Sequence, residues 1–270
     1  GTVIVSDSTF TGNFSNGSGG GILNYSTVTV SNSTFFSNRS EEGGGIANQS
    51  GAVTVSNSTF FGNYGIDGGG GLYNNSGGTV TVSNSTFSDN HGSLSFGGGG
   101  IYNATGTVIL KNTIVANSSE GGNCDGTITD GGGNLSYPDT TCPGINSDPM
   151  LGILQNNGGP TYTMALLPGS AAIDVGIDAT CAASPINNRD QRGIARPQGA
   201  HCDIGAVEQY CPSFVPPATV DVEDIVAIAT RWGWTNTSPG WDPAYDLNGD
   251  NRIDIVDITL VTKTWGAMCS

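Results

Sequence analysis

A unit of about 25 residues recurs along the first part of the chain, and a period of this size is typical of solenoids and limits the fold more than any other feature of the sequence. Each unit contains T-V-T-V-S-N-S-T-F-x-x-N, then a polar loop, then G-G-G-I-x-N. Equivalent phenylalanines stand once per unit, at Phe10, Phe35, Phe60 and Phe87. Apolar and polar residues alternate in the Thr-Val-Thr-Val segment, and β-branched residues with this alternation favour a strand. Three short strands per unit predict one coil of a parallel β-solenoid.

Stacked coils predict ladders of identical side chains about 4.8 Å apart. Two asparagine sets recur with the phenylalanines and are expected to stack their amides: Asn13, Asn38, Asn63 and Asn90, and Asn24, Asn48, Asn74 and Asn103. We assign a diverged fifth unit in which Ile114 replaces the phenylalanine and Asn117 the asparagine. The regular coils are therefore expected to span residues 1–117, in a protein of mainly β class.

The G-G-x-I and F-x-x-N segments resemble the repeats of bacterial surface and autotransporter-like β-helix proteins, including the polymorphic outer-membrane repeats. This resemblance implies a right-handed parallel β-helix on a cell surface. The period is lost over residues 118–210, which contain D-P-M-L-G, L-L-P-G-S-A-A-I-D, D-Q-R-G and C-D-I-G-A. That run resembles the choice-of-anchor Q region of secreted bacterial proteins. We expect it to form irregular last coils and a C-terminal cap, because an open solenoid end exposes strand edges.

Six cysteines occur without a C-x-x-C pair, which favours disulfides in an oxidising, extracellular setting over zinc or redox sites. Of 15 connectivities, nearest-neighbour pairing predicts Cys124–Cys142, Cys181–Cys202 and Cys211–Cys269. We therefore expect a secreted protein, extracellular or on the cell surface.

A Pro-rich linker is expected over residues 211–217, followed by a small module over 218–270 in which the pattern that begins at Asp221 occurs again from Asp254. Apolar residues at helical spacing in both copies predict two helices. The second helix is preceded by D-L-N-G-D-N-R-I-D-I-V-D, with oxygen-bearing side chains at positions 1, 3, 5, 9 and 12. This is the pattern of an EF-hand-type calcium loop, with Asn251 at the position where positive φ is needed. The predicted ligands are Asp246, Asn248, Asp250, the Arg252 carbonyl, Asp254 and Asp257.

The aspartate at position 12 and the helix spacing resemble dockerin modules. That resemblance implies one Ca²⁺ site, calcium-dependent folding and docking to a cohesin-like domain. In the first copy only Asp221 and Asp224 match loop positions, so we expect no tight calcium there. We expect Glu223 instead to cap the first helix.

Charge and the distribution of acids exclude several classes of function. Eight Lys and Arg against 23 Asp and Glu give a net charge of −15, which excludes a basic surface for nucleic acid, and no apolar run is long enough to span a membrane. Catalytic β-helices need clustered carboxylates with a base. Residues 1–106 hold five scattered acids and one cation, Arg39, so we expect a non-enzyme. The cluster of Arg189, Asp190, Arg192 and Arg196 is expected to form internal ion pairs, and the two histidines complete no triad.

Three functions remain open. The first is a structural or adhesive solenoid attached through its C-terminal module. The second is a filament subunit, in which the first coil, if Gly1 is the natural start, pairs with another copy. The third is a carbohydrate-binding or carbohydrate-active protein docked through cohesin, with a surface glycan on Tyr25, Tyr64, Tyr73 or Tyr102. For Tyr73 and Tyr102, packing between coils competes with glycan binding. We favour the first function.

Overall fold

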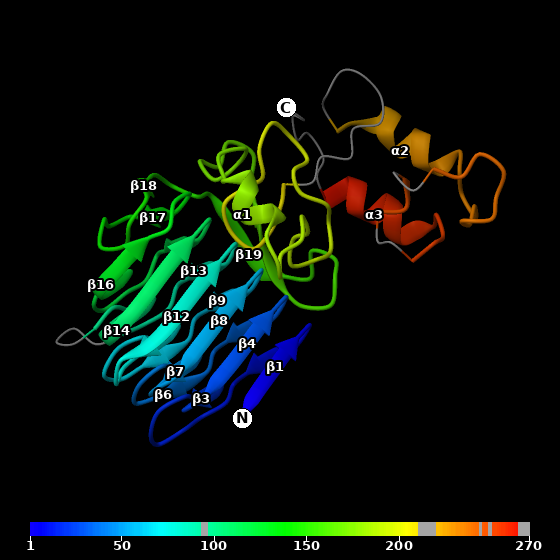
Figure 1. Ribbon diagram of the computed structural model, residues 1–270. Helices are drawn as coiled ribbons and strands as arrows, with labels where there is room; N and C mark the ends of the chain where they lie inside the picture. The colour runs from blue at the N-terminus through cyan, green and yellow to red at the C-terminus, as the bar shows by residue number, and fades with distance from the viewer. Residues whose placement is uncertain (93–96, 210–219, 243–244, 248–249, 264–270) are drawn as a thin grey trace.

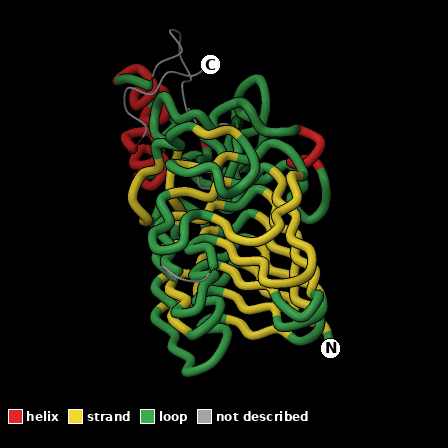
Figure 2. The backbone as a smooth tube through the Cα atoms, turned by 90° about the vertical axis from the view of Figure 1, so that its left-hand side faces the viewer, coloured by secondary structure: helices red, strands yellow, loops and turns green. Residues whose placement is uncertain are grey.

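The computed structural model describes residues 1–92, 97–209, 220–242, 245–247 and 250–263, with the Lys263 side chain left out. Parallel coils stack along one axis and form a β-solenoid of mainly β class, with few helices (Figures 1 and 2). The predicted fold class is confirmed at this level. No helix among the described residues is long and apolar enough to cross a membrane.

Two parallel sheets form the walls of the solenoid. The longer sheet contains one strand per coil: β1 (Thr2–Ser6), β4 (Thr27–Ser31), β8 (Ala52–Ser56), β12 (Gly78–Ser83), β14 (Ile101–Lys111) and β16 (Cys124–Asp130). Three shorter strands join this sheet through β14: β3 (Ile22–Asn24), β7 (Ile46–Asn48) and β11 (Leu72–Asn74). The second sheet contains β2 (Thr9–Thr11), β5 (Thr34–Phe36), β9 (Thr59–Phe61), β13 (Thr86–Ser88), β15 (Ile114–Ala116), β17 (Leu135–Tyr137) and β18 (Ile145–Asn146). A short pair, β6 (Arg39–Ser40) and β10 (Tyr64–Gly65), lies at one corner.

The expected ladders fill the interior. The Phe10, Phe35, Phe60 and Phe87 rings stack in parallel with centroids 4.6, 4.7 and 4.3 Å apart. The Asn38 amide donates to Asn63 at 2.9 Å, and Asn63 donates to Asn90 at 2.9 Å. Each amide thus pairs with the next within the buried core, where an unpaired polar group would be costly.

A third asparagine set makes the corners of the coils. Asn32, Asn57, Asn84 and Asn112 adopt φ of 50°, 44°, 45° and 44°, the left-handed region that asparagine tolerates better than most residues. These corner residues do not belong to the amide ladders, so the repeated asparagines perform two different tasks.

The predicted register of the fifth unit is wrong by one position. Phe87 pairs with Val115 and Thr86 pairs with Ile114, so Val115 continues the phenylalanine ladder and Ile114 faces outward. The coil from Phe87 to its partner Val115 is therefore one residue longer than predicted. Asn112 takes the corner position that Asn84 has in the preceding coil. Asn117 is consequently not a rung of the amide ladder, and adopts φ of 57°.

Residues 147–209 lie along the side of the solenoid, against the second sheet, and reach back to the second coil. We call them the lateral segment; it contains β19 (Leu151–Gln155), antiparallel to β20 (Thr163–Leu166), and α1 (Asp178–Ala182). The Thr161 hydroxyl donates to the Asn32 carbonyl at 3.0 Å, and the Ala206 amide donates to Thr86 at 3.0 Å. These contacts show that residues 147–209 form a side wall, which explains why outward-facing Thr59 and Ile114 are fully buried. That the segment also caps the end of the solenoid stays a prediction.

Two predicted disulfides are present, Cys124–Cys142 and Cys181–Cys202. The first fixes β16 to the loop before β18, and the second lies within the lateral segment. Cys211 and Cys269, predicted to form the third, lie outside the described residues, as does the expected linker over 211–217.

The C-terminal module contains α2 (Val222–Ala229) and α3 (Ile255–Lys263) and has a core of its own. Val220, Ile228, Leu247, Ile253 and Val261 are buried in it. Both predicted helices are therefore observed.

Candidate functional site

The predicted calcium loop wraps around the side chain of its first residue. Both Asp246 carboxylate oxygens accept backbone hydrogen bonds, from Asp250 N at 3.1 Å and Asn251 N at 2.8 Å. Asn251 adopts φ of 67°, as expected for the position where such loops usually place glycine. The chain therefore turns back at Asn251, which lets the carboxylate at position 1 bond the amides at positions 5 and 6.

The last two acids of the loop form the start of α3. Asp254 accepts from Val256 N at 2.9 Å, and Asp257 accepts from Asp254 N at 2.8 Å. The second Asp257 oxygen accepts from Leu247 N at 2.7 Å, so this buried carboxylate joins the beginning of the loop to its end. Acids in the first helical turn are favourable because they bind free amides and complement the helix dipole.

The first copy repeats this capping without a preceding acidic loop. Asp221 accepts from Glu223 N at 2.8 Å, and Asp224 accepts from Asp221 N at 2.9 Å, which makes a capping box at α2. The expectation that Glu223 caps this helix is wrong; its amide is the donor and the caps are Asp221 and Asp224. The reason is positional, since the residue before the helix and the third residue within it reach the free amides.

The loop supplies the oxygen donors that calcium prefers. Among the described residues, however, no three His, Cys, Asp or Glu side chains group closely enough to hold a metal ion, and Asn248 lies outside that part of the chain. Asp246, Asp250, Asp254 and Asp257 each bond at least one backbone amide of the loop or helix start. The backbone of Arg252 forms an isolated antiparallel β-bridge with Thr235, which holds the middle of the loop against the segment after α2.

Both helices of the module also carry apolar side chains away from its core. Val222 and Ile255, which occupy equivalent places in the two copies, are each 58 % exposed. Val226 and Trp232 on one copy and Val256 on the other are exposed as well. The helices therefore have one apolar side in the module core and a second one facing solvent, a distribution typical of interaction surfaces.

The acid–arginine cluster of the lateral segment is an internal network. Arg192 pairs with Asp190 at 2.6 Å, and fully buried Arg196 pairs with Glu208 at 3.0 Å, which confirms the predicted internal ion pairs. Arg189 differs: it is exposed and donates to the Gly193 carbonyl at 2.7 Å. The network fastens the loops of the lateral segment to one another.

Burial makes one acid of this network unusual. Desolvation raises the pKa of Asp203 to about 7, and the Glu208 carboxylate acts in the same direction, against hydrogen bonds from two backbone amides and the charge of Arg196. Burial also raises the pKa of Glu208. Sequence reasoning singled out the arginines and missed Asp203 and Glu208, because neither stands in a motif that marks its burial.

The two histidines have different partners. His91 Nδ1 contacts the Ser119 hydroxyl, and His201 Nδ1 contacts Asp178 at 2.9 Å. The His201 hydrogen bond holds the pKa of the Asp178 carboxyl below its usual value. In the described part of the chain no carboxylate bonds His91, so its contact with serine lacks the third group of a catalytic triad.

A comparison with protein-family models matches residues 1–136 to the right-handed β-helix region. The chain belongs to this family. Comparisons with curated proteins and with solved structures found no match. β-Helix proteins include lyases, hydrolases and non-enzymes, so membership establishes the fold and leaves the activity open.

In this β-helix protein, the four tyrosines proposed for glycan contact have different surroundings. Tyr25 is exposed, whereas Tyr73 is buried. Tyr73 pairs with Tyr102 on the next coil, with ring centroids 5.4 Å apart, and Tyr64 lies beneath the Arg39 guanidinium at 4.9 Å. Tyr73, Tyr64 and Tyr102 are thus engaged within the protein, whereas Tyr25 keeps an open ring.

Proposed function

We propose that this β-helix protein is a non-enzymatic, extracellular structural or adhesive solenoid that attaches to its partner through the C-terminal module. The solenoid is a rigid spacer, because its coils repeat the same stacked core. The module is the joint. The observation that carries the proposal is that α2 and α3 each have exposed apolar side chains, with Val222 and Ile255 at equivalent places.

A repeated surface suits a docking role. Exposed branched aliphatic side chains on two adjacent helices would be buried by a partner. Burial of apolar surface contributes about 25 cal/mol of favourable free energy per Å². The dockerin resemblance points to a cohesin-like domain as the partner. A second copy of this chain is the alternative, and it would build filaments.

Calcium is proposed to stabilise this joint. Asp246, Asn248, Asp250, Asp254 and Asp257 and the Arg252 carbonyl would hold one ion, while Asp221 and Asp224 serve only as helix caps. The ion would neutralise part of the acidic loop and so favour the folded module. The two disulfides agree with an extracellular location.

The test uses the full chain with calcium and with excess chelator. We expect one Ca²⁺ bound in calorimetry, a rise in module melting temperature, and binding to an immobilised cohesin domain or to a second copy. Val222→Glu combined with Ile255→Glu should abolish association and retain calcium. Asp246→Asn should weaken calcium binding by more than tenfold.

Leu23→Glu is the matched control, since Leu23 is an exposed apolar residue of the solenoid. If this control loses association to the same extent, the partner does not bind specifically through the module. Negative-stain microscopy separates the partners: filaments that dissociate in chelator identify a second copy, and short separate rods point to another protein. No association with either partner would contradict the proposal.

A further inference from the structure

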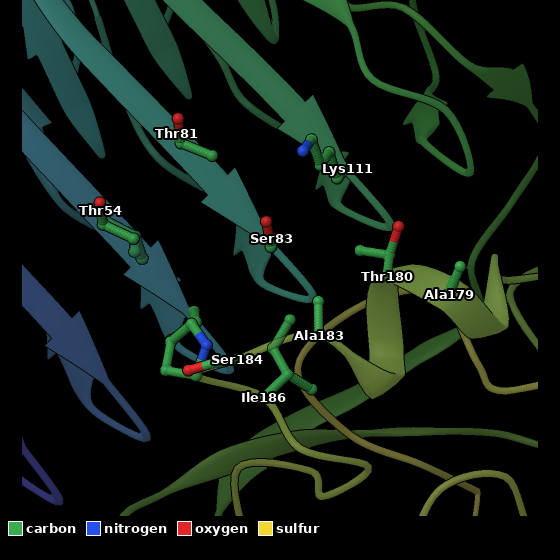
Figure 3. Close-up of a pocket in the computed structure, with 12 residues that line it drawn as sticks. Thr54, Thr81, Ser83, Lys111, Ala179, Thr180, Ala183, Ser184 and Ile186 are labelled. Atoms are coloured by element: carbon green, nitrogen blue, oxygen red, sulfur yellow. The ribbon is translucent and has the colours of Figure 1, made fainter.

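A groove lies between the outer face of the longer sheet and the lateral segment, with a volume of about 270 Å³ (Figure 3). Its floor is formed by Thr54 of β8, Thr81 and Ser83 of β12, and Lys111 of β14. Its wall is formed by residues 179–186, which begin in α1. Figure 3 shows the floor side chains on neighbouring strands, with Thr180 and Ser184 on the wall facing them.

The repeat places the floor groups in register. Thr81 pairs with Thr54, and Ser83 pairs with Lys111, so equivalent positions follow one another at about 4.8 Å from coil to coil. Thr81 and Ser83 face outward because the valines that alternate with them, Val80 and Val82, face the core. The floor therefore has two neighbouring rows: the hydroxyls of Thr54 and Thr81 lie in one, and Ser83 lies beside Lys111 in the other.

These polar groups have no hydrogen-bond partner in the described part of the protein. The hydroxyls of Thr54, Thr81 and Ser83 and the Lys111 ammonium form no hydrogen bond or ion pair with any other side chain or carbonyl in the described ranges. By contrast, the outward-facing hydroxyls of Thr34 and Thr59, on the second sheet, bond the lateral segment. The groove therefore presents free donors and acceptors beside a single positive charge.

The chemistry of the lining selects the ligand. Hydroxyls both donate and accept, which suits a molecule with hydroxyls around a ring, and Lys111 suits a carboxylate. Lys111 is the one charged side chain among the 12 residues of the lining, in a chain of net charge −15. An extended peptide would need an unpaired strand edge, whereas β8 and β12 are paired on both sides.

We propose that this groove binds an acidic sugar, with the carboxylate on Lys111 and the ring hydroxyls on Thr54, Thr81 and Ser83. The volume lies below the roughly 300–1,000 Å³ of drug-sized pockets, so it accommodates one or two sugar rings. The lining residues include no aromatic ring, carboxylate or imidazole. Binding therefore rests on polar contacts that compete with water, and we expect a Kd on the order of 1 mM and no cleavage of the sugar.

This binding is independent of attachment through the C-terminal module, since the groove belongs to the solenoid and its side wall. Binding is measured on the full chain in excess chelator, so that a failure of the calcium-dependent joint does not affect the result. The probes are digalacturonate and its neutral counterpart digalactose, titrated by NMR at low and high salt. We expect digalacturonate to bind at least fivefold more tightly, with the difference shrinking at high salt because salt screens the charge.

Two variants and one control locate the site. Lys111→Met should remove the preference for the acidic sugar, and Thr81→Val should weaken both sugars by at least threefold. Thr29→Val is the control, because Thr29 stands one coil before Thr54 on the same outward row, outside the groove lining. Unchanged melting temperatures establish that the variants fold.

Three outcomes would overturn the proposal. Digalacturonate that does not bind at about tenfold above the expected Kd would exclude the ligand. Equal binding of the acidic and neutral sugars would exclude the role of Lys111. Loss of binding in Thr29→Val as large as in Thr81→Val would place the sugar on the exposed sheet instead of in the groove.

Discussion

The solenoid and the lateral segment are built by opposite means. In the solenoid each contact recurs from coil to coil: the ring stack of Phe35 on Phe60 is repeated by Phe60 on Phe87, at 4.7 and 4.3 Å. In the lateral segment each contact occurs once. The Gln191 amide alone donates to Thr34 and Thr161, at 2.9 Å each, and accepts from Thr59 at 2.7 Å. Repetition spreads stability over many equivalent rungs, whereas the lateral segment concentrates it in a few side chains.

The largest effect is expected from the repeated core. Phe60→Ala should lower the free energy of unfolding by about 4 kcal/mol, because it removes a fully buried ring and two stacked partners. Phe35→Ala should cost the same within about 0.5 kcal/mol, since its surroundings are equivalent. Phe10→Ala should cost less than half as much, because Phe10 is only partly buried. Urea unfolding measures all three, and unequal costs for Phe35 and Phe60 would contradict the equivalence of the rungs.

A smaller loss is expected from one side chain of the lateral segment. Arg196→Met should cost about 3 kcal/mol, since it leaves the buried Glu208 and Asp203 acids without their cation. Hydrogen exchange should show increased opening of residues 190–208 with little change in the coils before Phe60. Arg189→Met is the control, because Arg189 is exposed and its loss should cost less than about 0.5 kcal/mol. A uniform rise in exchange would show that the two regions unfold as one unit.

The smallest effect concerns pH. The pKa of Asp203, raised to about 7 by burial, means that the folded protein keeps a proton which the unfolded chain releases above about pH 4. Stability from this group is therefore greatest at low pH and decreases as the pH rises toward 7. Asp203→Asn should reduce that slope between pH 5 and 7, as measured by thermal melts. Asp7→Asn removes an equal charge at an exposed place and should leave the slope unchanged; an unaffected slope in Asp203→Asn would assign it to another group.

Sequence reasoning predicted the repeated region well because the same residue pattern recurs in every coil. Phe, Val and Asn recur once per coil, and each stacks on its own kind. It failed at Ile114, where matching T-I-V-A-N to T-F-S-D-N concealed a shift of one position. The corner residue was the better marker: aligning Asn112 with Asn84 places Val115 on Phe87.

The groove and the ion network were beyond sequence reasoning for a different reason. Lys111 and Thr180 stand far apart in the sequence, and Arg196 and Asp203 belong to a segment without a period. Their neighbours depend on how the lateral segment folds back, which no local pattern encodes. In the C-terminal module the internal repeat predicted both helices, while the capping roles of Asp221 and Asp224 required the backbone to be seen.

The lateral segment also determines how the protein would respond to force. A pull on the C-terminal module enters the solenoid through residue 209, at the end of a segment bonded to several coils: Gln191 contacts Thr34 and Thr59, and Gly205 donates to the Asn112 carbonyl at 2.8 Å. A chain that left from the last coil would peel the coils away one at a time. Here several bonds must break together, so the side wall converts peeling into shear, and a tether built this way would hold under loads that would unwind a bare solenoid.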